Sequence, residues 1–326
     1  MNKSDLRIVF LGTPEFAVES LSRIVENGYN VVGVVTMPDK PAGRGHKLYQ
    51  SPVKEYAVAH NIPVLQPVKL KDPEFVEALS ALNADLFIVI AFRMLPEVVW
   101  TMPRLGTFNL HGSLLPKYRG AAPINRAIMN GEKETGVTTF FLKHEIDTGD
   151  MIGSRSIEIS EEDNAGTVHD RLMEIGAGMV IDTVENIING TLTTIPQPEG
   201  EFIPAPKIFR EDCRINWNRP AQEIHNHIRG LSPYPAAFTT MRDSNGKETD
   251  VKIFASRANI DNAPVFPSTL VPGDAFITGK RLFVATSTAP LEILAIQPSG
   301  KKRMETSAFL LGYHPIHFSS ELHSDE

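Results

Sequence analysis

Three side chains of different chemistry lie in the stretch TFNLHGSLLPKYRGAAPINRAIMNGEKETGVTTFFLKHEIDTGDMI, residues 107–152. They are the amide of Asn109, the imidazole of His111 and the carboxylate of Asp147. An amide N–H that meets a forming oxyanion stabilises it by roughly 3 kcal/mol. An imidazole exchanges a proton near neutral pH, and a carboxylate can orient it. This set predicts group transfer at a carbonyl carbon, with an amine from the substrate as nucleophile and neither a metal nor a covalent intermediate.

A purely structural interpretation of the same residues is also open at this point. His111 could cap a turn, Asn109 could satisfy backbone groups, and Asp147 could begin an Asx-turn before Gly149. The spacing of these residues alone does not separate that interpretation from the catalytic one.

The elements that must position these residues alternate between strand and helix. Short apolar runs predict buried parallel strands, and helices are expected where apolar residues recur with helical spacing. Thr13-Pro14 predicts a helix N-cap followed by proline at the first helical position, and Ser51-Pro52 is expected to open another helix. The strands are expected at Leu6–Gly12, Val31–Thr36, Val64–Leu65, Leu86–Ala91, Thr107–Leu110, Gly136–Phe141 and Met151–Ile159, and the clearest helices at Pro123–Asn130 and Thr167–Asn189.

This alternation predicts an α/β domain with an open, mostly parallel sheet and right-handed crossovers. Ligands of such sheets bind beyond the carboxyl ends of the strands. Asn109 and His111 fall at the end of one expected strand, and Asp147 follows another. One crevice can therefore hold all three.

The pattern changes at TLTTIPQPEGEFIPAPK, where four prolines predict a linker. We expect a catalytic domain at residues 1–190, this linker at 191–207, a small β-barrel domain at 208–318 and a tail at 319–326. The barrel is indicated by short apolar runs at Val251–Ala258, Arg281–Thr286 and Leu291–Pro298, which are separated by turns.

Composition limits the class of protein. The chain has 326 residues and a net charge of -7, which argues weakly against bulk binding of nucleic acid. The charge is uneven, however, because residues 207–318 carry about four more basic than acidic side chains, which permits local phosphate contacts. A single cysteine, Cys213, excludes an internal disulfide. We expect a cytoplasmic monomer with no secretion signal and no membrane span.

The segment NLHGSLLPKYRGAAPI, followed by DTGDMI, resembles the signature of the folate-dependent formyltransferase superfamily. The resemblance extends through IRGLSPYPAAF and PSGKKRM, and so covers nearly the whole chain. It implies a Rossmann-like formyltransferase domain followed by a barrel that resembles an OB-fold. It also implies that 10-formyltetrahydrofolate is the co-substrate and that no metal takes part.

The resemblance assigns roles to individual residues. Asn109, His111 and Asp147 match the catalytic residues of the superfamily. The segment that lines the folate site corresponds to Ser113, Leu114, Leu115 and Pro116. One departure is AFRMLP, in which Arg93 stands where a small residue is expected and the loop is shorter, so the pterin pocket is expected to differ in detail.

Three further features resemble the branch of the superfamily that formylates the methionine carried by initiator tRNA. They are the opening LGTPEFAV, the basic loop MPDKPAGRGHKLYQSPVK and the segment YRGAAPINRAI. The resemblance implies that the basic loop enters the acceptor end of the tRNA. The residues expected to contact tRNA are Lys40, Arg44, Lys47, Lys301, Lys302 and Arg303. By charge alone both basic segments are more typical of a solvated surface than of a tRNA contact. A small amine such as an amino-sugar nucleotide remains the alternative acceptor.

Other sites have little support. LGTPEF lacks the glycine spacing of a dinucleotide fingerprint, and the P-loop motif is absent. His225 and His227, two residues apart on an expected helix, point in different directions and are poor joint metal ligands.

Overall fold

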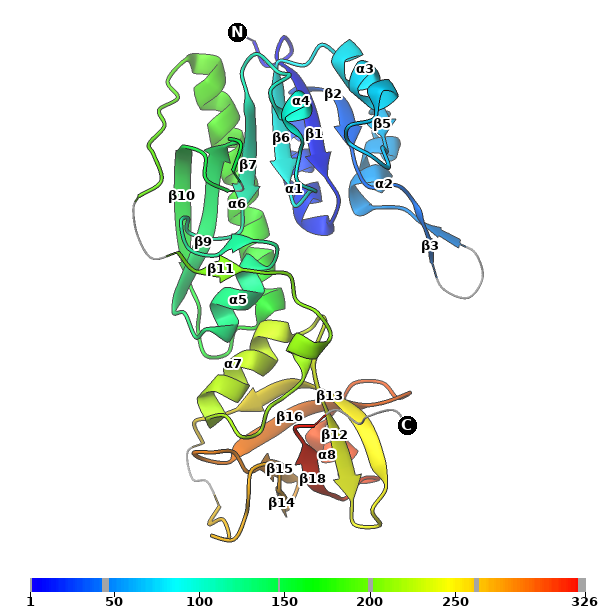
Figure 1. Ribbon diagram of the computed structural model, residues 1–326, viewed down its shortest axis with the longest axis vertical. Helices are drawn as coiled ribbons and strands as arrows, with labels where there is room; N and C mark the ends of the chain where they lie inside the picture. Colours follow the sequence, from blue (N-terminus) through cyan, green and yellow to red (C-terminus); the bar gives the residue numbers. More distant parts are fainter. Residues whose placement is uncertain (1, 43–46, 146, 199–201, 261–263, 322–326) are drawn as a thin grey trace. The chain divides into compact units, whose positions relative to one another are not determined.

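The structure is a computed structural model that describes residues 2–42, 47–145, 147–198, 202–260 and 264–321. The chain forms two compact units, called here the first unit and the second unit. The first unit comprises residues 1–120, 134–157 and 169–205. The second unit comprises residues 121–133, 158–168 and 206–326. The second unit therefore draws on two short segments from the middle of the chain as well as on its end (Figure 1).

The first unit is built on a seven-stranded sheet with the strand order β10-β9-β7-β6-β1-β2-β5. Its strands are β1 (Arg7–Gly12), β2 (Asn30–Val35), β5 (Val64–Leu65), β6 (Leu86–Ile90), β7 (Thr107–His111), β9 (Glu134–Phe141) and β10 (Met151–Glu158). Four pairs, from β7 through β6, β1 and β2 to β5, are parallel, whereas β9 runs antiparallel to β7. The mostly parallel α/β sheet expected from the sequence is confirmed.

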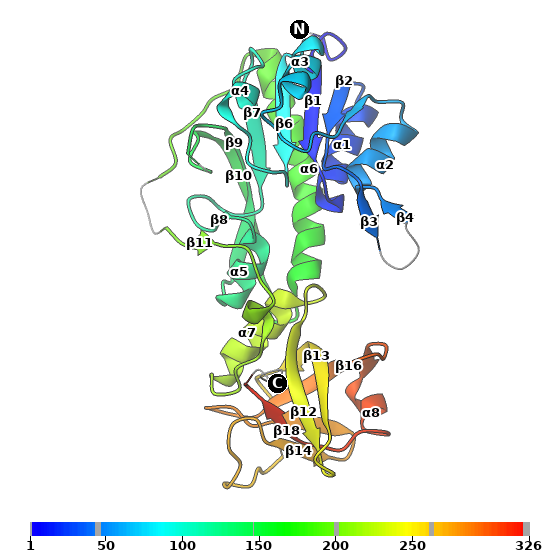
Figure 2. The ribbon, with the colours of Figure 1, turned by 45° about the vertical axis from the view of Figure 1, so that its right-hand side comes forward.

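The helices and smaller strands of the first unit surround this sheet. They are α1 (Glu15–Glu26), β3 (Lys40–Ala42), β4 (Lys47–Tyr49), α2 (Pro52–Ala59), α3 (Pro73–Ala81), α4 (Glu97–Trp100), β8 (Arg119–Gly120), β11 (Pro204–Ala205) and the greater part of α6 (Ala165–Asn189). Helices α1 and α6 lie on one face of the sheet, and α3 and α4 lie on the other (Figure 1). The β3–β4 hairpin extends away from the sheet (Figure 2).

The central strands are apolar without a break because they are covered on both faces. All five side chains of β6 are buried. In β1, Val9 and Leu11 pack with Phe75 of α3 and Val99 of α4, while the alternate residues face the other layer. Gly28 and Gly190 follow α1 and α6 with φ of +77° and +68°, a conformation that glycine adopts without strain.

The predictions for the starts of α1 and α2 have different outcomes. Ser51 caps α2, because its hydroxyl accepts a hydrogen bond from the Lys54 N–H at 3.1 Å. The cap predicted at Thr13 is wrong. Helix α1 begins at Glu15 with Pro14 in the cap position, and the Thr13 hydroxyl has no hydrogen-bond partner among the described residues.

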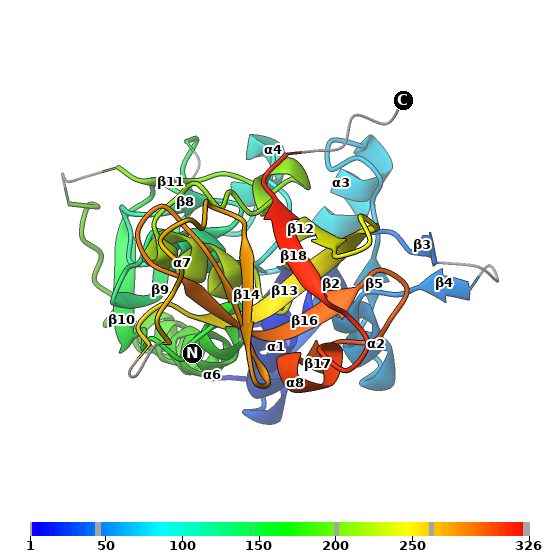
Figure 3. The same cartoon turned by 90° about the horizontal axis from the view of Figure 1, so that it is seen from below.

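The second unit is an antiparallel β domain with helices packed on it. Its elements are α5 (Pro123–Met129), η1 (Glu211–Cys213), α7 (Ala221–Leu231), β12 (Ala237–Asp243), β13 (Glu248–Arg257), β14 (Ala275–Thr278), β15 (Arg281–Val284), β16 (Leu291–Pro298), β17 (Met304–Glu305), α8 (Thr306–Phe309) and β18 (Pro315–Ser319). The strand order is β14-β15-β16-β13-β12-β18, with β17 paired to β16 (Figure 3).

The two edges of this second sheet meet. An antiparallel bridge joins Asp274, just before β14, to His317 of β18, and the Phe318 N–H donates to the Gly273 carbonyl at 2.7 Å. The sheet therefore curls round a core that contains Trp217, Ile253 and Phe318. The antiparallel β domain expected in the C-terminal part of the chain is confirmed.

Candidate functional site

Strand β7 places Asn109 and His111 on one face of the first sheet. Successive side chains of a strand alternate between its faces, so residues 109 and 111 share a face and Leu110 has the other. Leu110 contacts α6 at Gly176, so Asn109 and His111 lie on the opposite face, beside Val89 of β6. Among the hydrogen bonds between described residues, none occupies the Asn109 amide, which leaves its N–H group available to a ligand.

The His111 ring is buried, with 7% of its surface exposed, and one of its nitrogens is fixed. The Nε2 atom lies 2.8 Å from the Tyr118 carbonyl oxygen. A carbonyl oxygen only accepts, so Nε2 carries a proton and donates it. The lone pair of the neutral ring is therefore on Nδ1, which faces the Asp147 carboxylate at 3.9 Å.

Asp147 is held by backbone groups as well as by its position opposite His111. Its carboxylate oxygen Oδ2 accepts the Gly120 N–H at 3.1 Å. Its φ is +54°, which is uncommon for a residue other than glycine. Two residues later, a Cβ on Gly149 would lie 1.5 Å from the Phe141 carbonyl oxygen, so the loop passes against β9 with no space for a side chain.

A residue that the sequence did not indicate, Gln197, contacts this same loop. Its Nε2 atom donates to the carbonyl oxygens of Asp147, at 2.6 Å, and Gly149, at 3.0 Å. Gln197 belongs to the proline-rich stretch that the composition assigned to a linker. In the structure this stretch pairs with the first unit, through Ile195 with Met151 and through β11 with β8 (Figure 2). No helical or strand periodicity marks Gln197 in the sequence.

The segment expected to line the folate site turns only some of its side chains outward. Ser113 is fully buried, and its hydroxyl donates to the Lys117 carbonyl at 2.7 Å. Leu115 packs in a small core cluster with Phe140 and Met151. Leu114 and Pro116 are partly exposed. A ligand on this segment would therefore meet Leu114, Pro116 and the backbone rather than the Ser113 hydroxyl.

The departure at Arg93 has a structural role. Its guanidinium donates to the carbonyl oxygens of Pro67, at 2.7 Å, and Val68, at 2.9 Å. It also lies over the Phe92 ring, at 5.4 Å from the centroid. Burial lowers the pKa of the Arg93 guanidinium from its ordinary value. Arg93 thus joins the loop after β6 to the loop after β5.

The basic loop is described only in part. Lys40 is exposed on β3, whereas Arg44 and the Lys47 side chain lie outside the described residues. The base of the loop is fixed by Asp39, which pairs with Lys54 at 2.5 Å and accepts from Gln66 at 2.7 Å. These two hydrogen bonds, that of Lys54 first, lower the pKa of the Asp39 carboxyl.

The second basic segment lies in the second unit, between β16 and β17. Lys301 and Lys302 are exposed, and the Arg303 guanidinium lies over the Phe254 ring at 4.8 Å. The same loop supplies Ser299 and Gly300 to a cavity of about 660 Å³. This cavity was not expected from the sequence, and its lining includes Arg210, Lys252, Phe238 and the largely exposed Tyr234.

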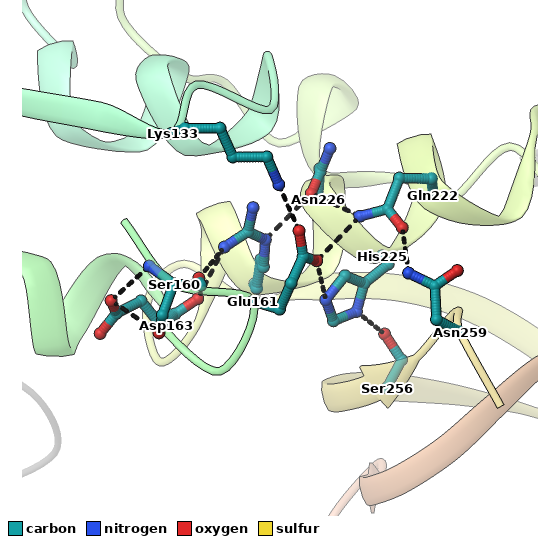
Figure 4. A network of polar contacts seen from close by, with 10 residues as sticks. Lys133, Ser160, Glu161, Asp163, Gln222, His225, Asn226, Ser256 and Asn259 are labelled. Carbon is teal, nitrogen blue, oxygen red and sulfur yellow. Dashed lines mark hydrogen bonds and ion pairs between the residues drawn. The ribbon is translucent and has the colours of Figure 1, made fainter. Parts of the chain in front are cut away.

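The two histidines of α7 differ in their contacts, because His225 has two polar partners whereas the buried Nε2 atom of His227 has no hydrogen-bond partner among the described residues. The His225 Nδ1 atom lies 3.0 Å from the Ser256 hydroxyl, and its Nε2 atom lies 3.9 Å from the Glu161 carboxylate (Figure 4). Burial, with a smaller effect of Arg229, lowers the pKa of His225. Burial also lowers the pKa of His227.

In the described part of the chain, no group of three or more histidine, cysteine, aspartate or glutamate side chains is arranged to hold a metal ion. No helix among the described residues is long and apolar enough to cross a membrane.

Comparison with known proteins identifies the family to which this fold belongs. Residues 6–184 match the family model described as "Formyl transferase", and residues 207–314 match "Formyl transferase, C-terminal domain". The chain belongs to the formyl transferase family.

Within the family the chain is similar to proteins named methionyl-tRNA formyltransferase. That of Bacteroides fragilis is 57% identical over 319 residues, covering 96% of this chain and 97% of the relative. That of Flavobacterium johnsoniae is 51% identical over 317 residues, covering 97% of this chain and 98% of the relative.

Solved structures of more distant proteins share the fold. An N-formyltransferase from Helicobacter canadensis, in complex with folinic acid and dTDP-3-aminofucose, has a TM-score of 0.61 and 21% identity, covering 90% of this chain and 99% of that one. HypX from Aquifex aeolicus, in complex with tetrahydrofolic acid, has a TM-score of 0.63 and 20% identity, covering 95% of this chain and 47% of that one.

Proposed function

We propose that this chain transfers the formyl group of 10-formyltetrahydrofolate to the α-amino group of methionine on initiator tRNA. The product is N-formylmethionyl-tRNA, which serves translation initiation. The observation that carries the proposal is the juxtaposition at the end of β7, where the Nδ1 atom of His111 faces Asp147 and Asn109 shares its face of the sheet. The identity of 57% to a protein named for this activity supports the choice of acceptor.

In this proposal the amine of the methionyl group attacks the formyl carbon. A C–N bond forms and the carbonyl oxygen becomes an oxyanion, to which Asn109 donates an N–H. The attacking nitrogen then carries an extra proton, which His111 accepts at Nδ1, because Nε2 already holds a proton for the Tyr118 carbonyl. Asp147 stabilises the imidazolium that results.

Collapse of the intermediate breaks the bond between the formyl carbon and N10 of the folate. The proton held on Nδ1 passes to N10, which leaves as a neutral amine of tetrahydrofolate. The proton lost by the methionyl amine is thus the proton gained by N10, so the reaction balances without a metal or an external acid.

The folate is proposed to lie against the segment Ser113, Leu114, Leu115 and Pro116. The partly exposed side chains of Leu114 and Pro116 supply apolar contact, while the buried Ser113 and Leu115 hold the segment in place. The opposite wall is expected from the loop that Arg93 fixes.

The tRNA is proposed to contact both units, through Lys40, Arg44 and Lys47 in the first and Lys301, Lys302 and Arg303 in the second. Cations of this kind bind phosphates without reading sequence. The cavity beside residues 299–303 adds Arg210 and Lys252 to the same part of the second unit and supports this assignment. We further propose that the chain works as a monomer in the cytoplasm, and light scattering on a gel-filtration column would test the oligomeric state.

The testing experiment is formyl transfer from 10-formyltetrahydrofolate to charged initiator Met-tRNA. Elongator Met-tRNA and a panel of amino-sugar nucleotides serve as competing acceptors. Rapid transfer to the initiator is expected, and the variants His111→Ala and Asn109→Ala should lose most of the turnover while remaining folded. Transfer to an amino-sugar nucleotide alone would overturn the acceptor, and near-normal rates in either variant would overturn the mechanism.

A further inference from the structure

We propose that Gln197 and Arg119 are positioning residues for the transfer reaction, which together hold the carboxylate of Asp147 opposite the Nδ1 atom of His111. The inference rests on the proposed function, because that function gives Asp147 its role. Neither residue is assigned a contact with the substrates. Each acts through the loop that carries Asp147.

The orientation of the Gln197 amide is fixed by its partners. Its NH₂ group faces the carbonyl oxygens of Asp147 and Gly149, which only accept hydrogen bonds. Its Oε1 atom faces the Nε and Nη2 atoms of Arg119, which only donate, with the Nε contact at 3.2 Å. All four contacts agree with one orientation of the amide, so the side chain has little freedom to rotate.

Arg119 is engaged with this amide rather than with an acid. Among the described residues its guanidinium forms no ion pair, and it lies 5.7 Å from the centroid of the Phe202 ring. The two donors of the guanidinium hold the oxygen of Gln197, and the nitrogen of Gln197 holds the loop. Arg119, Gln197 and the Asp147 backbone therefore form one continuous chain of hydrogen bonds.

The backbone around Arg119 also positions both catalytic partners. The Tyr118 carbonyl accepts from His111, and the Gly120 N–H donates to the Asp147 carboxylate. Strand β8, formed by Arg119 and Gly120, together with Tyr118 just before it, thus binds both His111 and Asp147. The Arg119 side chain adds a second attachment, because it reaches the backbone of Asp147 through Gln197.

The Asp147 loop needs such an attachment. Its positive φ of 54° is a conformation that persists in a residue other than glycine only where the surroundings fix it. On one side Gly149 rests against the Phe141 carbonyl, and on the other side the Gln197 amide bonds the flanking carbonyl groups. Without Gln197 the loop can relax, and the carboxylate then moves away from His111.

The first test replaces Gln197 with methionine, which has a similar length and no charge but cannot form these hydrogen bonds. We expect Gln197→Met to lower kcat on the order of 10- to 100-fold, as a small displacement of a catalytic group does. The KM values for Met-tRNA and for the formyl donor should stay within about twofold, since the residue binds neither. An unchanged kcat would overturn the proposal.

The second test needs no substrate. The ring signals of His111 are recorded by nuclear magnetic resonance at one fixed pH in the wild-type protein, Gln197→Met and Asp147→Asn. The carboxylate of Asp147 lies 3.9 Å from Nδ1, so its displacement changes the environment of the ring. The chemical shifts of His111 in Gln197→Met should therefore move toward those in Asp147→Asn, and unchanged chemical shifts would overturn the positioning role. If the wild-type protein formylated no Met-tRNA, the proposed function would fail while these spectra still decided the positioning.

The third test asks whether the two residues act as a unit. Arg119→Met and Gln197→Met should each reduce kcat. The kcat of the double variant should lie within about twofold of the kcat of the less active single variant. Arg119→Lys keeps a donor group on a single nitrogen and should recover part of the rate lost in Arg119→Met. Additive losses in the double variant would contradict the single chain of contacts.

Asn27→Ala is the matched control. The Asn27 amide also donates to a backbone carbonyl, that of Arg23, but it lies at an exposed helix end of the same unit.

Discussion

At the scale of single residues, the atom that acts as the base in the proposed mechanism is decided by a backbone carbonyl. If both ring nitrogens of His111 faced solvent, either of them could hold the proton of the neutral ring. The Tyr118 carbonyl removes the ambiguity, because it binds the proton on Nε2 and leaves Nδ1 as the basic atom beside Asp147. The sequence predicts that Asn109, His111 and Asp147 meet. It does not indicate which nitrogen reacts, since Tyr118 contributes only its backbone.

Replacing Asp147 with asparagine should separate the charge of this residue from its shape. We expect Asp147→Asn to reduce kcat by roughly 100-fold or more, because the imidazolium loses its counter-ion while the side chain keeps its volume. Steady-state kinetics and circular dichroism would measure turnover and folding. Asp150→Asn is the control in the same loop, since Asp150 forms a surface ion pair with Lys143 at 2.8 Å. Equal losses in both variants would contradict the assignment.

At the scale of elements, short strands and loops hold the side chains of the candidate site in position, while the long strands form the sheet on which they rest. The long strands were predictable because β1 and β6 are unbroken apolar runs, and α6 has a clear helical period. The pairing of β8 with β11 was not predictable, because two strands of two residues carry no periodic signal. For the same reason the proline-rich composition around Gln197 indicated a linker, although its backbone pairs with the first unit. The cap at Thr13 failed because Pro14, rather than Thr13, directly precedes the helix.

The Asp147 loop gives a prediction about space. A Cβ on Gly149 would overlap the Phe141 carbonyl, whereas a Cβ on Gly153 of β10 would meet only the Met179 side chain at 3.7 Å. We expect Gly149→Ala to lower the free energy of unfolding by about 1–3 kcal/mol or more, and Gly153→Ala to have little effect. Urea denaturation would measure both variants. Similar stabilities would show that the loop can move away from β9.

The strands of the second unit give a prediction about pH. Glu292 of β16 is buried and binds Arg281 at 2.7 Å and Arg257 at 3.2 Å. The hydrogen bond from Arg281 is the largest cause that lowers the pKa of Glu292 below its ordinary 4.5. Because the pKa is lower in the folded state, the pair stabilises the fold above about pH 4.5, and this stabilisation is lost as the pH falls through the lowered pKa.

Glu292→Gln should therefore cost about 2 kcal/mol of unfolding free energy near neutral pH, as expected for hydrogen bonds to a charged group. The difference between wild type and variant should shrink as the pH falls below about 4. Denaturant unfolding at a series of pH values would measure it. A difference that stayed constant with pH would mean that packing, and not charge, accounts for the loss.

At the scale of the whole molecule, the distribution of charge matters more than its sum. The net charge of -7 would oppose binding of nucleic acid, yet residues 207–318 carry an excess of about four positive charges. The exposed Lys301 and Lys302 directly follow Ser299 and Gly300, which line the same cavity as Arg210 and Lys252. This arrangement allows an acidic protein to present a basic surface locally.

Replacing Lys301 and Lys302 with serine should weaken tRNA binding and make the affinity less dependent on salt. The slope of log K against log salt should become shallower by roughly 0.7–0.9 for each phosphate that the variant no longer neutralises, while kcat at saturating tRNA stays the same. Fluorescence titration with tRNA at several salt concentrations would measure the slope. Lys280→Ser, an exposed lysine of the same unit, is the control. An equal change in the control would mean that only net charge, and not this loop, matters.

The discontinuous composition of the second unit has a consequence for synthesis on the ribosome. Helix α5 packs with α7 in the second unit, and the Asn125 amide of α5 donates to the Gly230 carbonyl of α7 at 2.7 Å. During synthesis, however, α5 leaves the exit tunnel long before α7. Ala127 and Ile128 of α5 are buried in the folded protein. In the nascent chain they stay exposed until the later part of the chain has emerged. The second unit is therefore completed only after its last strand, β18, has emerged, and a fragment that begins at residue 206 lacks the two earlier segments of this unit, residues 121–133 and 158–168.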